Sequence, residues 1–531
     1  MRSPLRVDKP ARIFLPLENA RIKGVSLPQI VSSNLGFKPG QDSQSGLKDA
    51  FNHFPVREYT VIEKGGIRIG IFGLLGKDAA HKLIYGQDIA VEDQVATATR
   101  ITKALKEQEK VDLIVCLSHS GTEPEDESED EILAEKVPAI DFIVSGHTHT
   151  LLPKPIIKGQ TIIGSVGCYG SYMGILKLDC RKGQRPKLVS YRLEKITPQS
   201  AESKAVAAAI GKFKQMVNRQ FLADYGYTYD QILAESSFNL ESMTEMSAKR
   251  LEFGLGDLVA DSFRAAVARA EGEDGDFLHA AVQPLGEIRA SLTAGPIEVD
   301  DVFQVLSLGQ GPNKTTGYPL VTFYLTGREI KNCLETQSTV APLKDNYNLQ
   351  VSGITFLYNP NRVPFDRVYN VKISTPGGGY EPMLPDKLYR VCASYYTSMM
   401  LSKMGSLSYG IISVTPKDKS GRPLSDLRQA LVDADPKTPG VQELKEWKAL
   451  ADYVSGQPDL NGNNIPDLPR QYSQPAGRYQ AVASWNPVDL FRETTRITWG
   501  LLLGFISLAG IMILAVRGVS RLIRRDRTTG M

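Results

Sequence analysis

The chain has few of the residues that build metal and redox sites, since its 531 residues include only six histidines and five cysteines. The cysteines are odd in number, scattered and without Cys-x-x-Cys spacing, which excludes a disulfide framework and a zinc ribbon. Residues 1–24 contain no apolar run and so lack the signature of a secretory signal. The formal net charge is +3 and basic residues cluster only near the C-terminal end, so we expect no nucleic-acid partner.

Length and composition are those of a folded protein with more than one domain. Hydrophobic residues make up 42% of the chain and charged residues 23%. A chain of this length exceeds a single core, which predicts two domains with further segments. In residues 1–195 apolar runs alternate with helical stretches such as Val95–Lys110, which predicts an α/β fold. Two strands, Thr161–Gly170 and Met173–Asp179, are expected to close its sheet, and Ala201–Tyr225 is expected to form a connecting amphipathic helix.

Three histidines come directly after apolar runs that have the character of buried strands. His119 follows the run 113–117, and His147 and His149 follow the run 140–144 within a Gly-His-Thr-His sequence. Loops at the carboxyl ends of parallel strands carry the functional site in α/β proteins. Neutral imidazoles bind zinc, and manganese or iron are alternatives, so this arrangement predicts a metal site.

The two histidine motifs resemble those of the calcineurin-like metallophosphoesterase superfamily, most closely its 5′-nucleotidase family. Two strand sequences, Pro28–Asn34 and Gly65–Leu74, add to the resemblance. The resemblance implies a β-sandwich flanked by helices, with two divalent metal ions (Zn, Mn or Fe) that activate water to hydrolyse a phosphate ester. It also implies that His119 and His147 hold one metal and His149 the other.

The resemblance lacks its first part. In the family, the strand that matches Pro28–Asn34 follows Asp-x-His, Gly-Asp and Gly-Asn-His motifs, and residues 1–24 supply none of them. Those motifs carry the carboxylate that bridges the metals and the catalytic histidine, so the catalytic residues stay unassigned. Two dications about 3.5–4 Å apart need bridging anions, which three imidazoles do not provide. We therefore expect an N-terminally incomplete member with its N-terminal strands missing and no measurable two-metal activity.

Residues 229–455 resemble the α+β C-terminal domain of 5′-nucleotidases, which binds the nucleoside part of the substrate. Arg289 ends a Leu-Gly-Glu-Ile-Arg sequence that resembles the family's Asn-x-Gly-x-Ile-Arg. Its guanidinium is a candidate contact for a substrate carboxylate or phosphate, with a structural salt bridge as an equal alternative. Tyr395 or Tyr396 is the candidate for stacking on a base, a contact worth about 1–3 kcal/mol. A second aromatic is replaced by Ser307–Gln310 and a Gly-Gly-Asp sequence is absent, so the substrate is a small-molecule phosphate ester with nucleotides as the default.

One long apolar run lies near the C-terminus. Residues 497–516 contain no charged residue. As a helix, this run is long enough to cross a hydrocarbon core of about 30 Å. Arg496 and Trp499 lie at one end and five arginines follow the other, which favours a membrane anchor over a buried core helix. The positive-inside rule then places the tail in the cytoplasm and the bulk of the chain outside, in the periplasm or at the cell surface. The signal sequence that this requires would be lost together with the missing metal motifs.

A further motif precedes this run. Asp459, Asn461, Asn463 and Asp467 place side-chain oxygens at positions 1, 3, 5 and 9 of a loop that resembles short extracellular calcium loops. Only two of the four are carboxylates, so a weak calcium site and a plain Asn/Gly/Pro-rich turn are equal alternatives.

The expected organisation combines these segments. It is an incomplete metallophosphoesterase domain (1–195), a linker helix (196–228), a substrate-binding domain (229–455), a stalk with the candidate calcium loop (456–495), a transmembrane helix (496–517) and a basic cytoplasmic tail (518–531). Asn34 is expected to be a structural residue at a strand end rather than a ligand, and His53, His81 and His279 are expected to be structural or solvent-exposed.

Three functions compete. The first is a membrane-anchored phosphoesterase of the 5′-nucleotidase type that acts outside the cytoplasm. The second is a hydrolase of the same superfamily that acts on a non-nucleotide substrate, such as a sulfur compound. The third is a non-catalytic binding protein that keeps the scaffold and has lost the chemistry.

Overall fold

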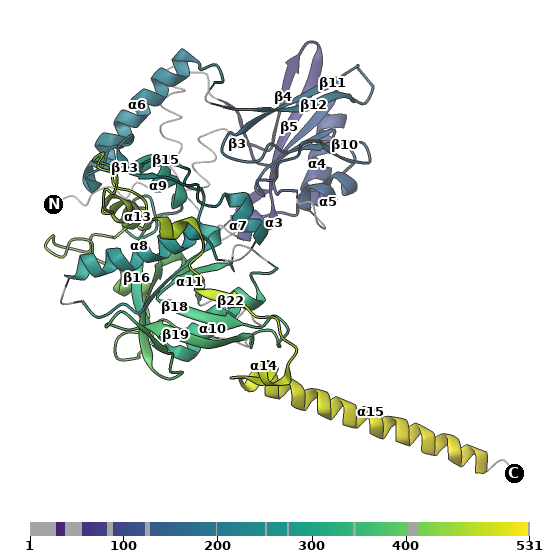
Figure 1. Cartoon of the computed structure of the whole chain (residues 1–531). Coiled ribbons are helices and arrows are strands. Elements are labelled where there is room, and N and C mark those ends of the chain that lie inside the picture. The colour runs from purple at the N-terminus through teal and green to yellow at the C-terminus, as the bar shows by residue number, and fades with distance from the viewer. Residues whose placement is uncertain are drawn as a thin grey trace, which may run out of the picture. The chain divides into compact units, whose positions relative to one another are not determined.

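The computed structural model of the chain (Figure 1) contains two compact units, Met1–Ser203 and Lys204–Met531. The residues that it describes are 28–37, 56–81, 89–122, 128–197, 199–249, 252–272, 275–343, 347–401 and 413–528. His53 lies outside the described residues, as do the side chains of His81 and of the basic tail from residue 518 onward. Each unit is described by itself below.

The first unit is built around a six-stranded sheet with the order β4-β5-β7-β8-β10-β9. Its strands are β4 (Tyr59–Lys64), β5 (Ile67–Leu75), β7 (Leu113–His119), β8 (Phe142–Ser145), β9 (Ile156–Lys158) and β10 (Thr161–Gly164). The four strands β5, β7, β8 and β10 are parallel, whereas β4 and β9 pair antiparallel at the two edges. The carboxyl ends of the parallel strands therefore meet at one edge of the sheet, where a site is expected.

Helices cover one face of this sheet. They are α4 (Gln94–Glu107) and α5 (Glu129–Lys136), whereas α3 (Lys77–His81) follows the end of β5. Asp93 and Ser128 cap α4 and α5 by accepting backbone N–H groups, as expected for N-cap residues. Gly70 permits close packing of α4, because a Cβ there would lie 2.8 Å from Leu105. On the opposite face Leu117 is 43% exposed, so that face is only partly covered.

Three two-stranded sheets complete the first unit. They are β1 (Ile30–Val31) with β3 (Val56–Arg57), β2 (Leu35–Phe37) with β6 (Ile89–Val91), and β11 (Tyr172–Asp179) with β12 (Lys187–Lys195). The prediction that residues 173–179 close the main sheet is therefore wrong, since β11 pairs with β12 in a separate two-stranded sheet. Instead, Tyr191 of β12 packs against Gly164, where a Cβ would lie 3.1 Å from its ring.

The second unit contains two four-stranded sheets, β16-β21-β14-β17 and β20-β19-β18-β22, and the pair β13-β15. The strands are β13 (Ile232–Ser236), β14 (Ala280–Pro284), β15 (Gly295–Glu298), β16 (Leu320–Thr326), β17 (Leu349–Ser352), β18 (Ile354–Tyr358), β19 (Val368–Ser374), β20 (Tyr380–Pro382), β21 (Leu388–Ser394) and β22 (Tyr479–Ala481). The helices are α6 (Lys204–Gln220), η3 (Leu222–Tyr225), α7 (Met243–Lys249), α8 (Gly254–Glu271), η5 (Leu285–Glu287), α9 (Val299–Val305), α10 (Gly327–Thr339), α11 (Tyr395–Leu401), η7 (Leu427–Ala430), α13 (Glu446–Ser455), η8 (Arg470–Ser473), α14 (Pro487–Phe491) and α15 (Arg496–Thr528).

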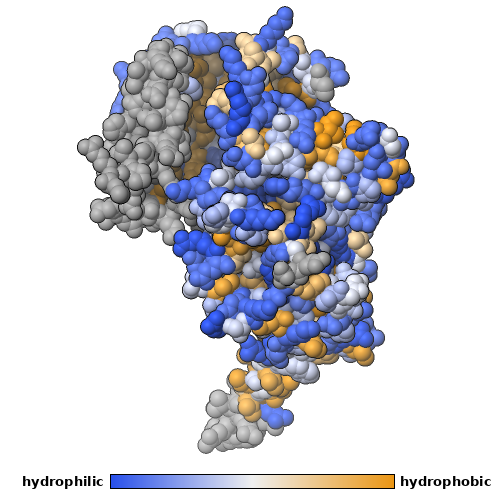
Figure 2. Space-filling view, turned by 90° about the vertical axis from the view of Figure 1, so that its left-hand side faces the viewer, coloured by the Kyte–Doolittle hydropathy of each residue, from blue (hydrophilic) through white to orange (hydrophobic). Residues whose placement is uncertain are grey.

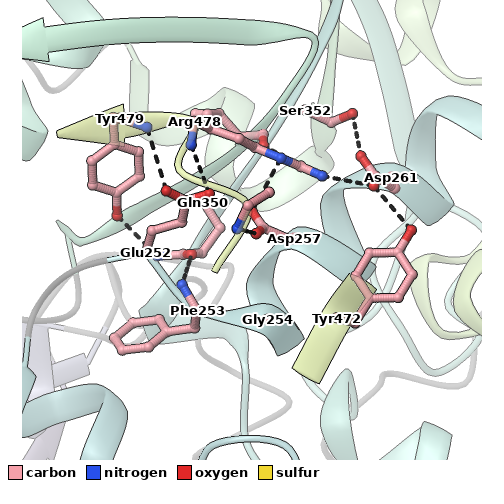
Figure 3. A network of polar contacts seen from close by, with 12 residues as sticks. Glu252, Phe253, Gly254, Asp257, Asp261, Gln350, Ser352, Tyr472, Arg478 and Tyr479 are labelled. Atoms are coloured by element: carbon pink, nitrogen blue, oxygen red, sulfur yellow. Dashed lines mark hydrogen bonds and ion pairs between the residues drawn. The ribbon is translucent and has the colours of Figure 1, made fainter. Parts of the chain in front are cut away.

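Residues 466–481, inside the range expected to be a stalk, are part of the folded second unit. Arg478 forms ion pairs with Asp257 (3.3 Å) and Asp261 (2.7 Å) of α8, as Figure 3 shows. Its backbone N–H donates to Glu252 at 2.9 Å. β22 then adds to β18 as a parallel strand. Residues 466–481, which we call the strap, are therefore bound to the domain by ion pairs, hydrogen bonds and strand pairing and do not form a flexible stalk.

Close packing between this strap and α8 depends on glycine. A Cβ at Gly254 would lie 1.9 Å from the backbone oxygen of Tyr472, and one at Gly256 would lie 2.2 Å from Gln350. Tyr472 is itself buried and donates its hydroxyl to Asp261 at 3.0 Å. The glycines at the start of α8 therefore allow the strap and β17 to approach the helix backbone.

The C-terminal helix α15 extends away from the rest of the second unit (Figure 1). Within its stretch Arg496–Arg517, an 18-residue window has a mean hydropathy of 2.3, and none of that window is buried. Among the described residues this is the one helix long and apolar enough to cross a membrane. The expected fold class is confirmed: an α/β first unit, a mixed α and β second unit, and one apolar helix at the C-terminal end.

Candidate functional site

The three predicted histidines lie at the carboxyl end of β7 and β8. His119 is the last residue of β7, and its ring centroid is 4.9 Å from that of His147. His149 points elsewhere and meets the edge of the Tyr169 ring at 5.7 Å. His147 and His149 have φ values of 75° and 59°, a left-handed conformation that is costly for residues other than glycine and that clusters at functional sites.

A carboxylate that the sequence analysis did not identify joins this cluster. Asp78, in the first turn of α3, lies 2.9 Å from His147, between Oδ2 and Nε2. Glu129 accepts the backbone N–H groups of Lys77 and Asp78 at 2.8 and 3.1 Å and so fixes the start of α3. The sequence carried one weak signal, because Asp78 follows β5 just as His119 ends β7.

The loops beneath the histidines are held by a small polar network. Thr148 donates its hydroxyl to the backbone oxygen of Thr122 at 2.9 Å, and Gly121 leaves space for it, since a Cβ there would lie 2.2 Å from Thr148. Asp130 is fully buried and accepts the Ser118 hydroxyl at 2.5 Å. Burial raises the pKa of Asp130 to about 6, although its hydrogen bonds oppose this. The Gly-His-Thr-His loop is thus fixed by the groups below it.

The described residues do not by themselves make a metal centre. Burial and the neighbouring His147 lower the pKa of His119, which favours the neutral imidazole that a metal needs. In the described part of the chain, however, no three His, Cys, Asp or Glu side chains are arranged to hold a metal ion. His119 and His147 are close enough to share a ligand, whereas His149 is turned toward Tyr169. The described residues therefore provide the histidines of the expected two-metal site without the further ligands that such a site needs.

Two other candidates of the sequence analysis have structural roles. Asn34 is completely buried, donates to the backbone oxygen of Leu75 at 2.9 Å and accepts the Leu75 N–H at the same distance. His279 accepts the backbone N–H of Arg390 at 3.1 Å and packs against Phe277 and Tyr389. Both positions are structural, as expected.

In the second unit, the predicted substrate residues lie on two segments that contact each other, one following η5 and the other at the start of α11. Arg289 is half-buried after η5, and its backbone N–H donates to Val305. Tyr395 and Tyr396 begin α11. Glu287 joins the two loops, because it accepts the hydroxyls of Ser394 (2.5 Å) and Thr397.

Tyr396 already has one aromatic neighbour. Its ring stacks on Tyr318 with centroids 5.3 Å apart and planes at 18°. Gly309 makes room for Tyr318, because a Cβ at that position would lie 2.0 Å from the ring. A base could therefore stack only on the remaining face of Tyr396 or on Tyr395. The roles of Arg289, Tyr395 and Tyr396 stay predictions.

Two buried carboxyl groups lie beneath these loops and were missed by the sequence analysis. Glu287 is 2% exposed, and burial raises its pKa to about 7. The hydrogen bonds donated by the hydroxyls of Ser394 and Thr397 act in the opposite direction and lower the pKa. Glu446, at the start of α13, is fully buried, and neither of its oxygens has a hydrogen-bond partner in the described structure. Burial, followed by the proximity of Glu287, raises the pKa of Glu446 well above its usual value. The sequence could have indicated burial of Glu446, because helical spacing puts it on the same buried face of α13 as Ala449 and Leu450.

Two cavities of the second unit lie away from these residues. One, of about 500 Å³, is lined by Arg390, Glu271 and Lys417, whose charges are already paired with one another or with neighbours. The other, of about 510 Å³, lies between α6 and α9 and is lined by Phe213 and Phe303. Neither cavity includes a residue that the sequence analysis predicted for substrate binding.

The candidate calcium loop gains an acidic neighbour from β13. Glu235 accepts the side-chain amides of Asn461 (2.5 Å) and Asn463 (2.9 Å). Asp459 accepts backbone N–H groups within the loop, and Asp467 accepts the N–H of Leu460 at 2.7 Å. All four predicted side chains thus lie in one exposed turn beside a carboxylate distant in sequence. The structure places them together, and calcium binding stays a prediction.

The chain is similar in sequence to 5′-nucleotidases and a related nucleotide phosphoesterase. The family model of the 5′-nucleotidase C-terminal domain matches residues 232–404. A trifunctional nucleotide phosphoesterase of Bacillus subtilis is 27% identical over 392 residues, which cover 72% of this chain and 24% of that protein. A 5′-nucleotidase of Diplobatis ommata is 24% identical over 397 residues, which cover 70% of this chain and 63% of that protein. The chain thus spans less than two thirds of the length of either relative.

Solved structures share the fold. A 5′-nucleotidase precursor from Thermus thermophilus superposes with a TM-score of 0.60 at 23% identity, over 90% of this chain and 81% of that one. A sulfate thiohydrolase from the same species superposes with a TM-score of 0.52 at 18% identity, over 86% of this chain and 72% of that one.

Proposed function

We propose that the chain is a member of the 5′-nucleotidase family and a hydrolase of phosphate esters whose default substrates are nucleotides. The observation that carries the proposal is the meeting of His119 with the Gly-His-Thr-His loop at the carboxyl end of parallel strands. The second unit supports it, because the loops that carry Arg289 and Tyr396 are joined through Glu287. The names of the relatives, a nucleotide phosphoesterase and a 5′-nucleotidase, support the substrate class.

The proposal includes dependence on divalent metal ions such as zinc, manganese or iron. When bound, such ions activate water and neutralise phosphoryl oxygens. His119, His147 and His149 are the nitrogen donors available, and Asp78 offers an oxygen beside His147. The remaining anionic donors have to come from outside the residues that the structure describes, because those residues do not form a metal-binding cluster. The catalytic residues accordingly stay unassigned.

We also propose that α15 anchors the protein in a membrane, with the bulk of the chain outside the cytoplasm. A core helix of a soluble protein is mostly buried, whereas none of the 18-residue apolar window of α15 is buried. A signal sequence lies near the N-terminus, whereas α15 lies at the other end of the chain. Arginines on its C-terminal side support a cytoplasmic tail.

The test uses the full-length protein isolated from its native membrane, with any segment that it carries there in addition to the 531 residues. With Mn²⁺ or Zn²⁺ it should release phosphate from AMP, a UDP-sugar or a simple phosphate ester, and His147→Ala should abolish the release. The matched variant Lys154→Ala, on an exposed position of the same loop region, should leave it unchanged. Absence of phosphate release from every ester would refute the proposal, and nucleotide binding without hydrolysis would identify a non-catalytic binding protein.

A further inference from the structure

Large apolar side chains are exposed where the second unit meets α15. Trp485 is 75% exposed, Val488 70%, Phe491 43% and Trp499 53%. The rings of Phe491 and Trp499 stack with centroids 5.8 Å apart. Trp485, Val488 and Phe491 of the α14 region and Trp499 of α15 together form what we call the α14 surface. Soluble proteins rarely expose such side chains in a group unless the group binds something.

The segment that carries this surface is fastened to the domain. Ser484 exchanges hydrogen bonds with Asn359, with its oxygen accepting the side-chain amide at 2.8 Å and its N–H donating at 3.3 Å. Asn486 caps α14 by accepting the N–H of Val488 at 3.0 Å, and Pro487 occupies the first turn. The orientation of α14 on the domain is therefore set by hydrogen bonds.

The first turn of α15 is fastened as well. Asp366 is completely buried and accepts the backbone N–H of Thr495 at 2.8 Å and the hydroxyl of Thr498 at 2.6 Å. A carboxylate at this position also interacts favourably with the helix dipole. Arg362, itself 4% exposed, lies 3.7 Å from Asp366 and balances its charge. The α14 surface and the start of α15 consequently keep a fixed relation to the domain.

The chemistry of the surface fits the boundary between lipid and water. Tryptophan favours the headgroup level, where its ring is apolar and its N–H stays hydrated. The surface is continuous with the apolar side chains of α15, on which Leu503 and Phe505 are 65% and 69% exposed, and Figure 2 shows hydrophobic residues gathered where this helix leaves the domain. Arg492 and Arg496 are exposed on the same segment, and basic side chains there attract anionic headgroups.

We propose that the α14 surface binds the headgroup layer of a lipid bilayer and holds the second unit against the membrane. The proposal rests on the membrane-spanning role proposed for α15. It goes beyond an anchor, because an anchor alone would leave the domain free to move away from the membrane. The strap, α14 and Asp366 instead make the domain, the α14 surface and the first turn of α15 one body, so insertion of α15 brings the surface to the lipid boundary.

The three tryptophans of the chain permit a direct test in the full-length protein, reconstituted in vesicles of phosphatidylcholine and phosphatidylglycerol. Trp447 is fully buried, so Trp499→Phe leaves Trp485 as the one tryptophan that lipid can reach, and Trp485→Phe leaves Trp499. Lipids brominated near the headgroup end of the acyl chain should quench both variants. The double variant, which keeps only Trp447, should not be quenched.

Each outcome separates the two proposals. Quenching of Trp499 without Trp485 overturns the α14 surface proposal and leaves the membrane span standing, whereas quenching of neither overturns both. In the Trp499→Phe background, Val488→Asp should lower the quenching of Trp485 at least twofold, because it places a charge in the surface. The matched variant Val189→Asp, at a position of the first unit with 63% exposure, should leave it unchanged. Equal quenching in both variants would overturn the proposal.

Discussion

Glu287 should make the stability of the second unit fall between mildly acidic and mildly alkaline pH. Burial raises its pKa from 4.5 to about 7 in the folded state, whereas in the unfolded chain the ordinary value applies. Between these two values the folded state binds more protons than the unfolded state. The stabilisation is therefore complete below the unfolded pKa and is lost as the pH rises through the folded one.

The size of the effect follows from this difference. One pKa unit corresponds to about 1.4 kcal/mol, so the full difference is worth roughly 3 kcal/mol. About 2.5 kcal/mol of it falls between about pH 5 and about pH 8, where Glu287 gives up its proton in the folded state. Glu446 is buried nearby, and the charge on ionised Glu287 helps to raise the pKa of Glu446 well above its usual value. Glu287→Gln is neutral at every pH and keeps an acceptor for the hydroxyls of Ser394 and Thr397.

The assay is urea unfolding of the full-length chain in detergent micelles at the two pH values. In a Trp485→Phe, Trp499→Phe background, Trp447 is the sole tryptophan and reports from the core that also contains Leu285 and Ile288 beside Glu287. The pH-dependent loss of unfolding free energy should be about 2.5 kcal/mol smaller in Glu287→Gln than in the background. Glu202→Gln, at an exposed position, should behave like the background. Parallel losses in Glu287→Gln and its background would refute the reasoning.

Three further outcomes are expected. The 531-residue chain should bind fewer than two tightly held zinc ions by elemental analysis, and two such ions per chain would contradict the incomplete site inferred from its three histidine donors. Calcium at about 1 mM should raise the unfolding free energy by about 1.4 kcal/mol if the Asp459 loop binds it with a Kd of about 0.1 mM. Glu235→Gln and Asp459→Asn should each remove this gain. If calcium leaves the unfolding free energy of the wild type unchanged, the loop is a plain turn. Arg478→Met should cost about 3 kcal/mol in urea unfolding because it leaves Asp257 and Asp261 without their cation, whereas a loss equal to that of the exposed Arg470→Met would show that the strap is not held by these ion pairs.

The sequence predicted best what depends on neighbours along the chain. The apolar runs before His119 and His147 are β7 and β8, and the helical stretch Val95–Lys110 is α4 with ends that differ by a few residues. Such elements follow from local periodicity and capping. The assignment of residues 173–179 to the main sheet failed because strand partners are chosen by packing, and β12 lay nearby as a partner for β11.

The sequence could not show side chains that join a site from distant segments. Asp78 reaches His147 across 69 positions, and Glu235 reaches the loop at Asn461 across 226. Glu287 was visible only as one letter of a motif, although it is the group that connects the loop of Arg289 to α11. Such contacts depend on the packing of whole elements, which local pattern does not encode.

The two units differ in how completely their apolar side chains are buried, and this difference affects which measurements each unit permits. In the second unit a fully buried core surrounds Trp447, and the strap adds the buried Tyr472 to it. In the first unit Leu117 and Val144 remain 43% and 40% exposed on the sheet face that leads to the histidines. An apolar sheet face ordinarily packs against a second layer of secondary structure. In the described residues the histidine cluster likewise lacks three donors arranged to hold a metal ion. The substrate-binding roles predicted for Arg289, Tyr395 and Tyr396 can therefore be tested by nucleotide binding, separately from hydrolysis.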